Sequence, residues 1–181
     1  MAIIKPNNNT ISAITALPAG VGGKVLQVVS HENGYEQTST STSFTDVLSA
    51  SSTTWEPSIT PTVSTSKILV LSSIHIAPRD NADTIQNKRF HLYCDSKIGS
   101  GSYTAFLYQE YLGQYYYNST SRSQPMEAGI YNVNSKQFDH NTTDEIKFRW
   151  QYRVLSSGAK VGMHGGGAND KRSTVTFMEI A

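Results

Sequence analysis

The chain has 181 residues, which is enough for one domain with an extended arm and for a core that needs no disulfide staple. Its formal net charge is +1, from 15 basic and 14 acidic residues, and this balance argues against nucleic acid as a partner, since nucleic-acid binders usually carry a basic stripe. A disulfide framework is excluded because Cys94 is the single cysteine. No apolar run reaches the roughly 18 residues of a membrane span, and we expect no membrane partner.

Residues 1–23 have no clear helical or strand period, yet they are rich in large apolar side chains. Leaving such side chains in water costs roughly 25 cal/mol per Å² of apolar surface, so we predict an arm that docks on a partner rather than a disordered tail, which is the alternative. The predicted docking residues are Ile3, Ile4, Ile11, Ile14 and Leu17. The predicted hinge between arm and domain consists of Gly20, Gly22 and Gly23.

From residue 24 to 181 the sequence predicts one β-domain of short strands separated by turn signals. In its first half the predicted strands are 24–30, 36–50, 58–61 and 66–78. Segment 36–50 is rich in serine and threonine, which is typical of a disordered linker, but threonine also favours strands. A polar edge strand is the other interpretation, because Phe44, Val47 and Leu48 directly follow the serine and threonine run. Segment 66–78 has apolar residues on both faces at its start and is therefore predicted to be a central strand.

In the second half the predicted strands are 88–95, 103–112, 126–135, 145–155, a short one within 156–171, and 173–180. Segment 88–95 alternates, with three inward positions (Phe90, Leu92, Cys94) and three outward ones (Arg89, His91, Tyr93). Segment 145–155 alternates throughout and predicts one core face and one solvent or partner face. No segment has a convincing helical period, so the fold class is all-β: an antiparallel sandwich, jelly roll or barrel.

No constellation of catalytic or metal-binding residues stands out. The five histidines lack metal-pair spacing, and the sequence contains no GxSxG elbow, phosphate loop or paired CxxC. Asp139 and His140, beside Asp144 and Glu145, are interpreted as a polar hairpin tip, and Cys94 as a small core residue. We therefore expect no catalytic residue, no metal and no cofactor.

Tyrosines concentrate around the segment 113–118. Tyrosine suits surfaces where the ring is buried and the hydroxyl is hydrogen-bonded, as at protein interfaces and sugar sites. A recognition or oligomer surface is one interpretation, and ordinary strand tyrosines beside an exposed loop are the other. The residues concerned are Tyr111, Tyr115, Tyr116 and Tyr117.

Three segments carry a resemblance to a known group: GKVLQVVS (23–30), SITPTVSTSKILVL (58–71) and RSTVTFMEI (172–180). In this order they resemble a widespread group of small bacteriophage virion proteins, the capsid cement (decoration) and tail fibre proteins. The resemblance covers both ends of the chain, whereas 79–145 carries no motif of the group. It implies a β-sandwich of jelly-roll type with an extended N-terminal arm, often trimeric, on the virion exterior.

The resemblance implies two functions. The first is a non-enzymatic homotrimeric cement protein whose arms bind the major capsid protein on the virion surface, after assembly in the bacterial host cytoplasm. The second is a tail fibre or receptor-binding module that joins tail proteins and recognises host-surface glycans. A glycan-active enzyme would need two carboxylates a few ångströms apart on a concave face, and the sequence nominates no such pair.

Overall fold

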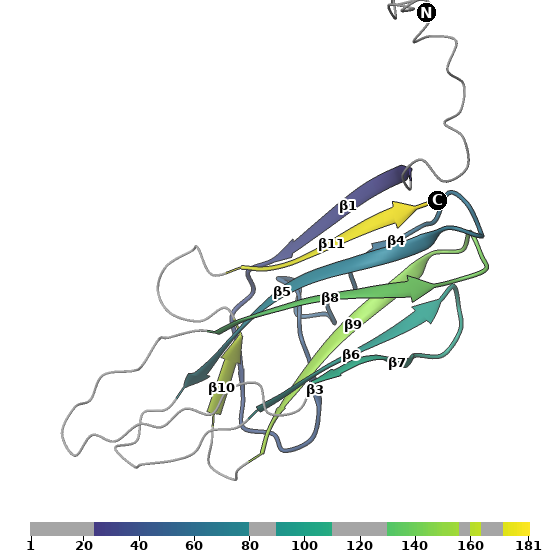
Figure 1. Cartoon of the computed structure of the whole chain (residues 1–181). Helices are drawn as coiled ribbons and strands as arrows, with labels where there is room; N and C mark the ends of the chain where they lie inside the picture. The colour runs from purple at the N-terminus through teal and green to yellow at the C-terminus, as the bar shows by residue number, and fades with distance from the viewer. Residues whose placement is uncertain (1–23, 80–89, 110–129, 156–159, 164–171) are drawn as a thin grey trace, which may run out of the picture.

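The computed structural model describes residues 24–79, 90–109, 130–155, 160–163 and 172–181. Within these ranges the chain forms eleven strands in two antiparallel sheets that pack face to face, and it contains no helix (Figure 1). The predicted all-β sandwich is therefore confirmed. The predicted arm, 1–23, lies outside the described residues.

Sheet I contains both ends of the described chain. Across its width the order is β1 (Val25–Asn33), β11 (Ser173–Ile180), β5 (Lys67–Arg79) and β8 (Ile130–Asp139). Beyond the end of β11 the short strand β10 (Lys160–Met163) pairs with β5, and β2 (Gln37–Ser39) pairs with β10. The strand β5 is thus paired on both sides, as predicted for its two apolar faces.

Sheet II has β9 (Ile146–Val154) and β6 (Phe90–Ile98) at its centre, and β7 (Thr104–Gln109) pairs with the free side of β6. On the other side of β9 lie two short strands, β3 (Thr45–Asp46) and β4 (Ser58–Ile59).

The pairing is that of one long hairpin rolled into a sandwich. Four pairs show it: Val28 with Met178, Ser58 with Lys147, Lys67 with Asp139, and Tyr93 with Tyr108. In each pair the two residues lie about equally far along the chain, in opposite directions, from the turn between β6 and β7. In this turn Gly99 adopts a φ of 54° that favours glycine. Successive pairs belong alternately to sheet I and sheet II, so the fold is a jelly roll.

The core lies between the sheets and is aromatic at its centre. Burial alternates without exception along β9, as its sequence period predicts. Phe148 is fully buried and its ring lies 5.0 Å from that of Phe177 and 5.2 Å from that of Phe106. Cys94 is also fully buried, in agreement with its predicted inward position.

Two predicted segments differ from the observed strands. The predicted strand 36–50 is interrupted after β2 because serine side chains bond the backbone there: Ser39 Oγ accepts from the Ser41 amide, and Ser41 Oγ donates to the Ser43 carbonyl. The predicted strand 126–135 is observed as β8, Ile130–Asp139.

One further interpretation needs correction. The turn after Asp139 is no hairpin tip, because β8 and β9 belong to different sheets and the turn crosses between them. His91 occupies its predicted outward position, yet it is only 3% exposed, and the guanidinium of Arg153 lies 3.1 Å from its Nδ1.

Replacing Phe148 by alanine tests the core. The variant loses its contacts with four aromatic rings and leaves a cavity, so we expect it to lower the free energy of unfolding by about 3–5 kcal/mol. Urea denaturation measures the change. Ser102→Ala, at an exposed residue of the turn between β6 and β7, is the control and should change stability by less than about 0.5 kcal/mol.

Candidate functional site

A buried carboxylate lies at the end of the sandwich where the described chain begins and ends. Along β11 the inward positions Ser173, Val175 and Phe177 face the core, and Glu179 takes the next inward position with 0% of its surface exposed. A buried carboxylate is costly unless hydrogen bonds or opposite charges compensate it. The surroundings of Glu179 therefore determine whether this end of the molecule is stable.

Hydrogen-bond donors from two other segments compensate Glu179. The backbone amides of Thr62 and Val63 donate to its Oε1 at 2.9 and 3.0 Å, and the Thr62 hydroxyl donates to Oε2 at 2.9 Å. Ser66 Oγ lies 2.6 Å from Oε1, and Gln27 Nε2 donates to Oε2 at 2.7 Å. We call Glu179 and these four residues the Glu179 clamp.

The clamp fixes the charge state of Glu179. Burial by itself raises the pKa of a carboxyl group, but the hydrogen bonds from Ser66, Thr62, Gln27 and Val63 favour the ionised form and lower the pKa of Glu179 from 4.5 to about 2. The clamp thus holds a carboxylate, rather than a carboxylic acid, at neutral pH.

Ser66 also contacts His140, so serine, histidine and glutamate meet in one place. His140 Nε2 lies 3.3 Å from Ser66 Oγ, and Nδ1 donates to the Thr142 carbonyl at 2.9 Å. In a catalytic triad the histidine lies between the serine and the acid and removes the serine proton. Here the serine lies between the other two, is 2% exposed and bonds the carboxylate directly, so this cluster is a structural one.

The clamp joins the three segments on which the family resemblance depends. Gln27 lies in GKVLQVVS, Thr62, Val63 and Ser66 lie in SITPTVSTSKILVL, and Glu179 lies in STVTFMEI. Gln27 Nε2 also lies 2.7 Å from the Thr60 carbonyl. Residues far apart in the sequence are therefore tied together by one carboxylate.

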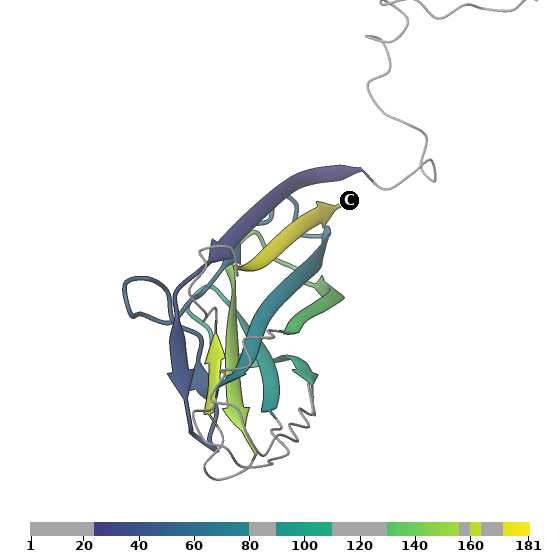
Figure 2. The same ribbon diagram turned by 90° about the vertical axis from the view of Figure 1, so that its left-hand side faces the viewer.

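The described chain begins directly beside the clamp. The Ala181 amide donates to the Lys24 carbonyl at 3.0 Å, so the β1–β11 ladder continues to the first described residue. Figure 1 and Figure 2 show the start of β1 and the carboxyl terminus at the same end of the sandwich. The first described residue is therefore held in a hydrogen-bonded strand.

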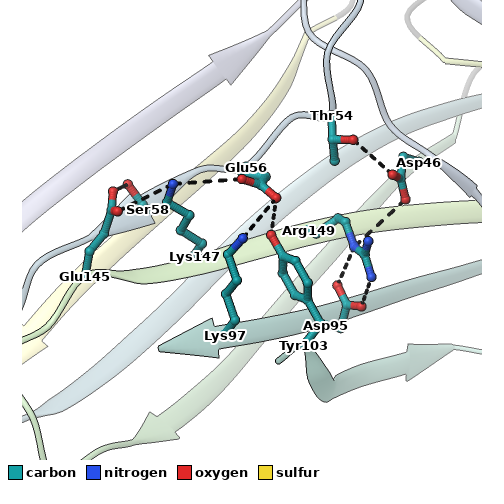
Figure 3. A network of polar contacts seen from close by, with 10 residues as sticks. All are labelled: Asp46, Thr54, Glu56, Ser58, Asp95, Lys97, Tyr103, Glu145, Lys147 and Arg149. Carbon is teal, nitrogen blue, oxygen red and sulfur yellow. Dashed lines mark hydrogen bonds and ion pairs between the residues drawn. The ribbon is translucent and has the colours of Figure 1, made fainter. Parts of the chain in front are cut away.

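A second polar cluster covers the outer face of sheet II (Figure 3). At its centre Arg149, on β9, donates to Asp95, on β6, through Nε at 3.0 Å and through Nη2 at 2.5 Å. Asp46 lies 3.9 Å from the same guanidinium and accepts a hydrogen bond from Thr54. These bonds with Asp95 and the nearby Asp46 raise the pKa of Arg149.

The same network continues toward the turn between β6 and β7. Glu56 contacts Lys97 at 3.6 Å and Lys147 at 3.9 Å, and the Tyr103 hydroxyl donates to it. Lys147 also lies 3.5 Å from Glu145. Burial and the hydrogen bond to Glu56 raise the pKa of Tyr103, so the phenol stays protonated.

The network has the chemistry of a paired surface rather than of a reaction centre. A general acid requires a carboxyl group with a raised pKa, whereas Glu145 has a lowered pKa, chiefly because Ser58 donates a hydrogen bond to it. Among the described residues no group of three or more histidine, cysteine, aspartate or glutamate side chains could hold a metal ion. In the same part of the chain no helix is long and apolar enough to span a membrane.

The predicted site residues lie outside the described residues. This holds for the docking residues Ile3, Ile4, Ile11, Ile14 and Leu17, for the hinge Gly20, Gly22 and Gly23, and for Tyr111, Tyr115, Tyr116 and Tyr117. Their flanks are described: β1 begins at the clamp end, whereas β7 ends at Gln109 and β8 begins at Ile130, both toward the opposite end.

The sequence interpretation missed the Glu179 clamp, although a signal was present. The period of two in STVTFMEI assigns Glu179 to the same face as Val175 and Phe177, which predicts a buried acid. Its partners could not be predicted from the period, because they lie in β1 and in the loop before β5, all more than a hundred residues earlier in the chain.

Comparisons with known proteins give little similarity. No family model matches the sequence, and no curated protein matches it significantly. Among solved structures, that of the infectious bursal disease virus Gx strain is similar with 12% sequence identity and a TM-score of 0.37. The match covers 87% of this chain but only 37% of the viral chain.

The clamp predicts a specific pH dependence. Because the pKa of Glu179 is about 2 in the folded state and near its ordinary 4.5 in the unfolded state, its stabilisation is complete above 4.5 and is lost as the pH falls toward 2. The shift corresponds to a loss on the order of 3 kcal/mol. Glu179→Gln should be less stable than wild type at pH 7 by a similar amount.

Urea denaturation at a series of pH values between 7 and 2 measures the free energy of unfolding of wild type and of Glu179→Gln. The difference in unfolding free energy should narrow as the pH falls, because protonated Glu179 is neutral like glutamine. A difference that stays constant over this range would contradict the clamp, since the other acids are common to both proteins.

Proposed function

We propose that the chain is a non-enzymatic structural protein of a bacteriophage virion, a homotrimeric cement protein that stabilises the assembled capsid through its N-terminal arms. A protein that binds only the assembled lattice favours that lattice by mass action. Arms linked in one trimer add avidity, because the second and third arms bind at high effective concentration.

The observation that carries this proposal is the attachment of the arm. Lys24 is the first described residue and already bonds Ala181, and three residues later Gln27 is tied to Glu179 and to the Thr60 carbonyl. A pull on Lys24 along the axis of β1 would act on the β1–β11 ladder, which extends from Val25 to Asn33. The load is therefore distributed over a whole strand, as a tether requires.

The described polar clusters are consistent with a structural role. In sheet II the four acidic side chains of the network each contact a basic side chain: Glu56, Glu145, Asp46 and Asp95. Glu179 is saturated with hydrogen bonds. These groups stabilise the sandwich. They offer no pair of carboxyl groups with separated pKa values, which acid–base hydrolysis would require.

The arrangement of the two ends of the sandwich also favours a second candidate, a tail fibre or receptor-binding module. The end of β7, Gln109, and the start of β8, Ile130, both lie at the end of the sandwich far from Lys24. The tyrosine-rich segment 110–129 is therefore connected at the end opposite the predicted arm. An arm on the tail and tyrosines directed at host-surface glycans would use this arrangement as well.

Deleting residues 1–20 tests the tether. We expect the truncated protein to keep its β-sheet circular dichroism and lose binding to expanded capsids, because the apolar docking residues are gone. Co-sedimentation with purified capsids measures binding. Full binding by the folded truncated protein would refute docking through the arm.

Tyr115→Ala and Tyr116→Ala distinguish the two candidates. For a cement protein both variants should bind capsids like wild type, whereas for a receptor-binding module they should lose binding on a glycan array. The location of the wild-type protein in images of the particle is the independent measurement. A position on the tail would favour the second candidate.

A further inference from the structure

The outer face of sheet I differs in chemistry from the outer face of sheet II. Four rows of side chains cross β1, β11, β5 and β8 in register. The two middle rows are Val28–Met178–Leu69–Gln137 and Ser30–Thr176–Leu71–Ser135. Neither row contains a charged residue, although both lie on the outside of the domain.

Apolar side chains remain exposed on this face. Val28 is 56% exposed and Val25 46%, on β1, and Val133 is 74% exposed, on β8. Met178, Leu69 and Leu71 lie half-buried between these edges. Neighbouring strands in a sheet are about 4.8 Å apart, so these side chains form one continuous surface. Contiguous apolar surface of this kind usually marks an interaction site.

Charged residues flank the middle rows and pair with one another. At the clamp end Lys67 lies 3.8 Å from Asp139, and toward the other end Arg172 lies 3.1 Å from Glu32. An uncharged centre with a polar rim is the composition of a protein interface. Since the rim charges are already paired, a second copy of the same face meets no net repulsion.

The outer face of sheet II is unsuited to the same contact. It carries the ion pairs of Arg149, Lys97 and Lys147, and burying them against another protein would remove water from several charges. Such desolvation can exceed the Coulombic gain. The two faces of the sandwich are thus distinct: sheet II has a charged outer face and sheet I an uncharged one.

We propose that the outer face of sheet I, centred on Val28, Met178, Leu69 and Leu71, is the surface through which copies of this chain associate. This inference deepens the proposed homotrimer and rests on it for the existence of partner copies. The residue types match this occupant. In a trimer each contact joins two different parts of the surface of neighbouring copies, and a face without unpaired charges brings no like charges together in that arrangement.

The place of the arm supports the same occupant. Val25 immediately follows Lys24, so the arm leaves the domain at the edge of this face. When copies are related by a rotation axis along the strands, their arms leave the oligomer at one end. The association thereby gathers the apolar docking residues of several copies, which is the condition for avidity.

A charge placed on the face tests the proposal. Val28→Lys and Val133→Lys alter side chains that are largely exposed in the single chain, so the fold should be retained. Each variant places like charges in every copy of the interface, and we expect association to weaken by roughly tenfold or more. The measurement is the mass of the full chain in solution, by light scattering over a concentration series.

Ala105→Lys is the matched control, because Ala105 is exposed on β7 of sheet II. It should associate like wild type, and thermal melting should show all variants folded. An associated wild type with equally associated Val28→Lys and Val133→Lys variants would overturn the proposed face and leave the homotrimer standing. A wild type that is monomeric throughout would overturn the homotrimer itself.

Discussion

The Glu179 carboxylate is the constraint on which this end of the molecule depends. It is buried at the last inward position of β11, and its cost is offset only because the Thr62 and Val63 amides, two hydroxyl groups and the Gln27 amide are directed at it. One charge therefore fixes the loop before β5, the start of β1 and the end of β11. Each contact requires the others, since an incomplete shell would leave a buried charge unsatisfied.

The jelly roll places this constraint where a tether needs it. A hairpin rolled about the turn at Gly99 pairs the first strand with the last, so the beginning of β1 and the end of β11 meet at one end. The described chain thus begins in a strand held by a full ladder and by the clamp. The strands that flank the tyrosine-rich segment 110–129 meet it at the opposite end, so the proposed attachment and the alternative recognition surface would lie at different ends of the sandwich.

The outer faces of sheet I and sheet II differ in charge and therefore suit different surroundings. On sheet II, Arg149 and its neighbours form ion pairs that suit contact with water. On sheet I the middle rows are free of charge, and Val28 and Val133 on the edge strands β1 and β8 are exposed. We infer that the first face is directed to solvent and the second to other copies, which relates the fold to the proposed trimer.

The sequence by itself determined the elements whose pattern is local. The period of two in 145–155 and 173–180 defined the core faces of β9 and β11, because side chains in a strand alternate whatever the strand pairs with. The tertiary structure alone decided the partners. The burial of His91 under Arg153, the crossing of the turn after Asp139 between the sheets, and the donors around Glu179 all depend on residues distant in the chain. No local pattern encodes such contacts, so the clamp and the uncharged face emerged only once the strands were placed in register.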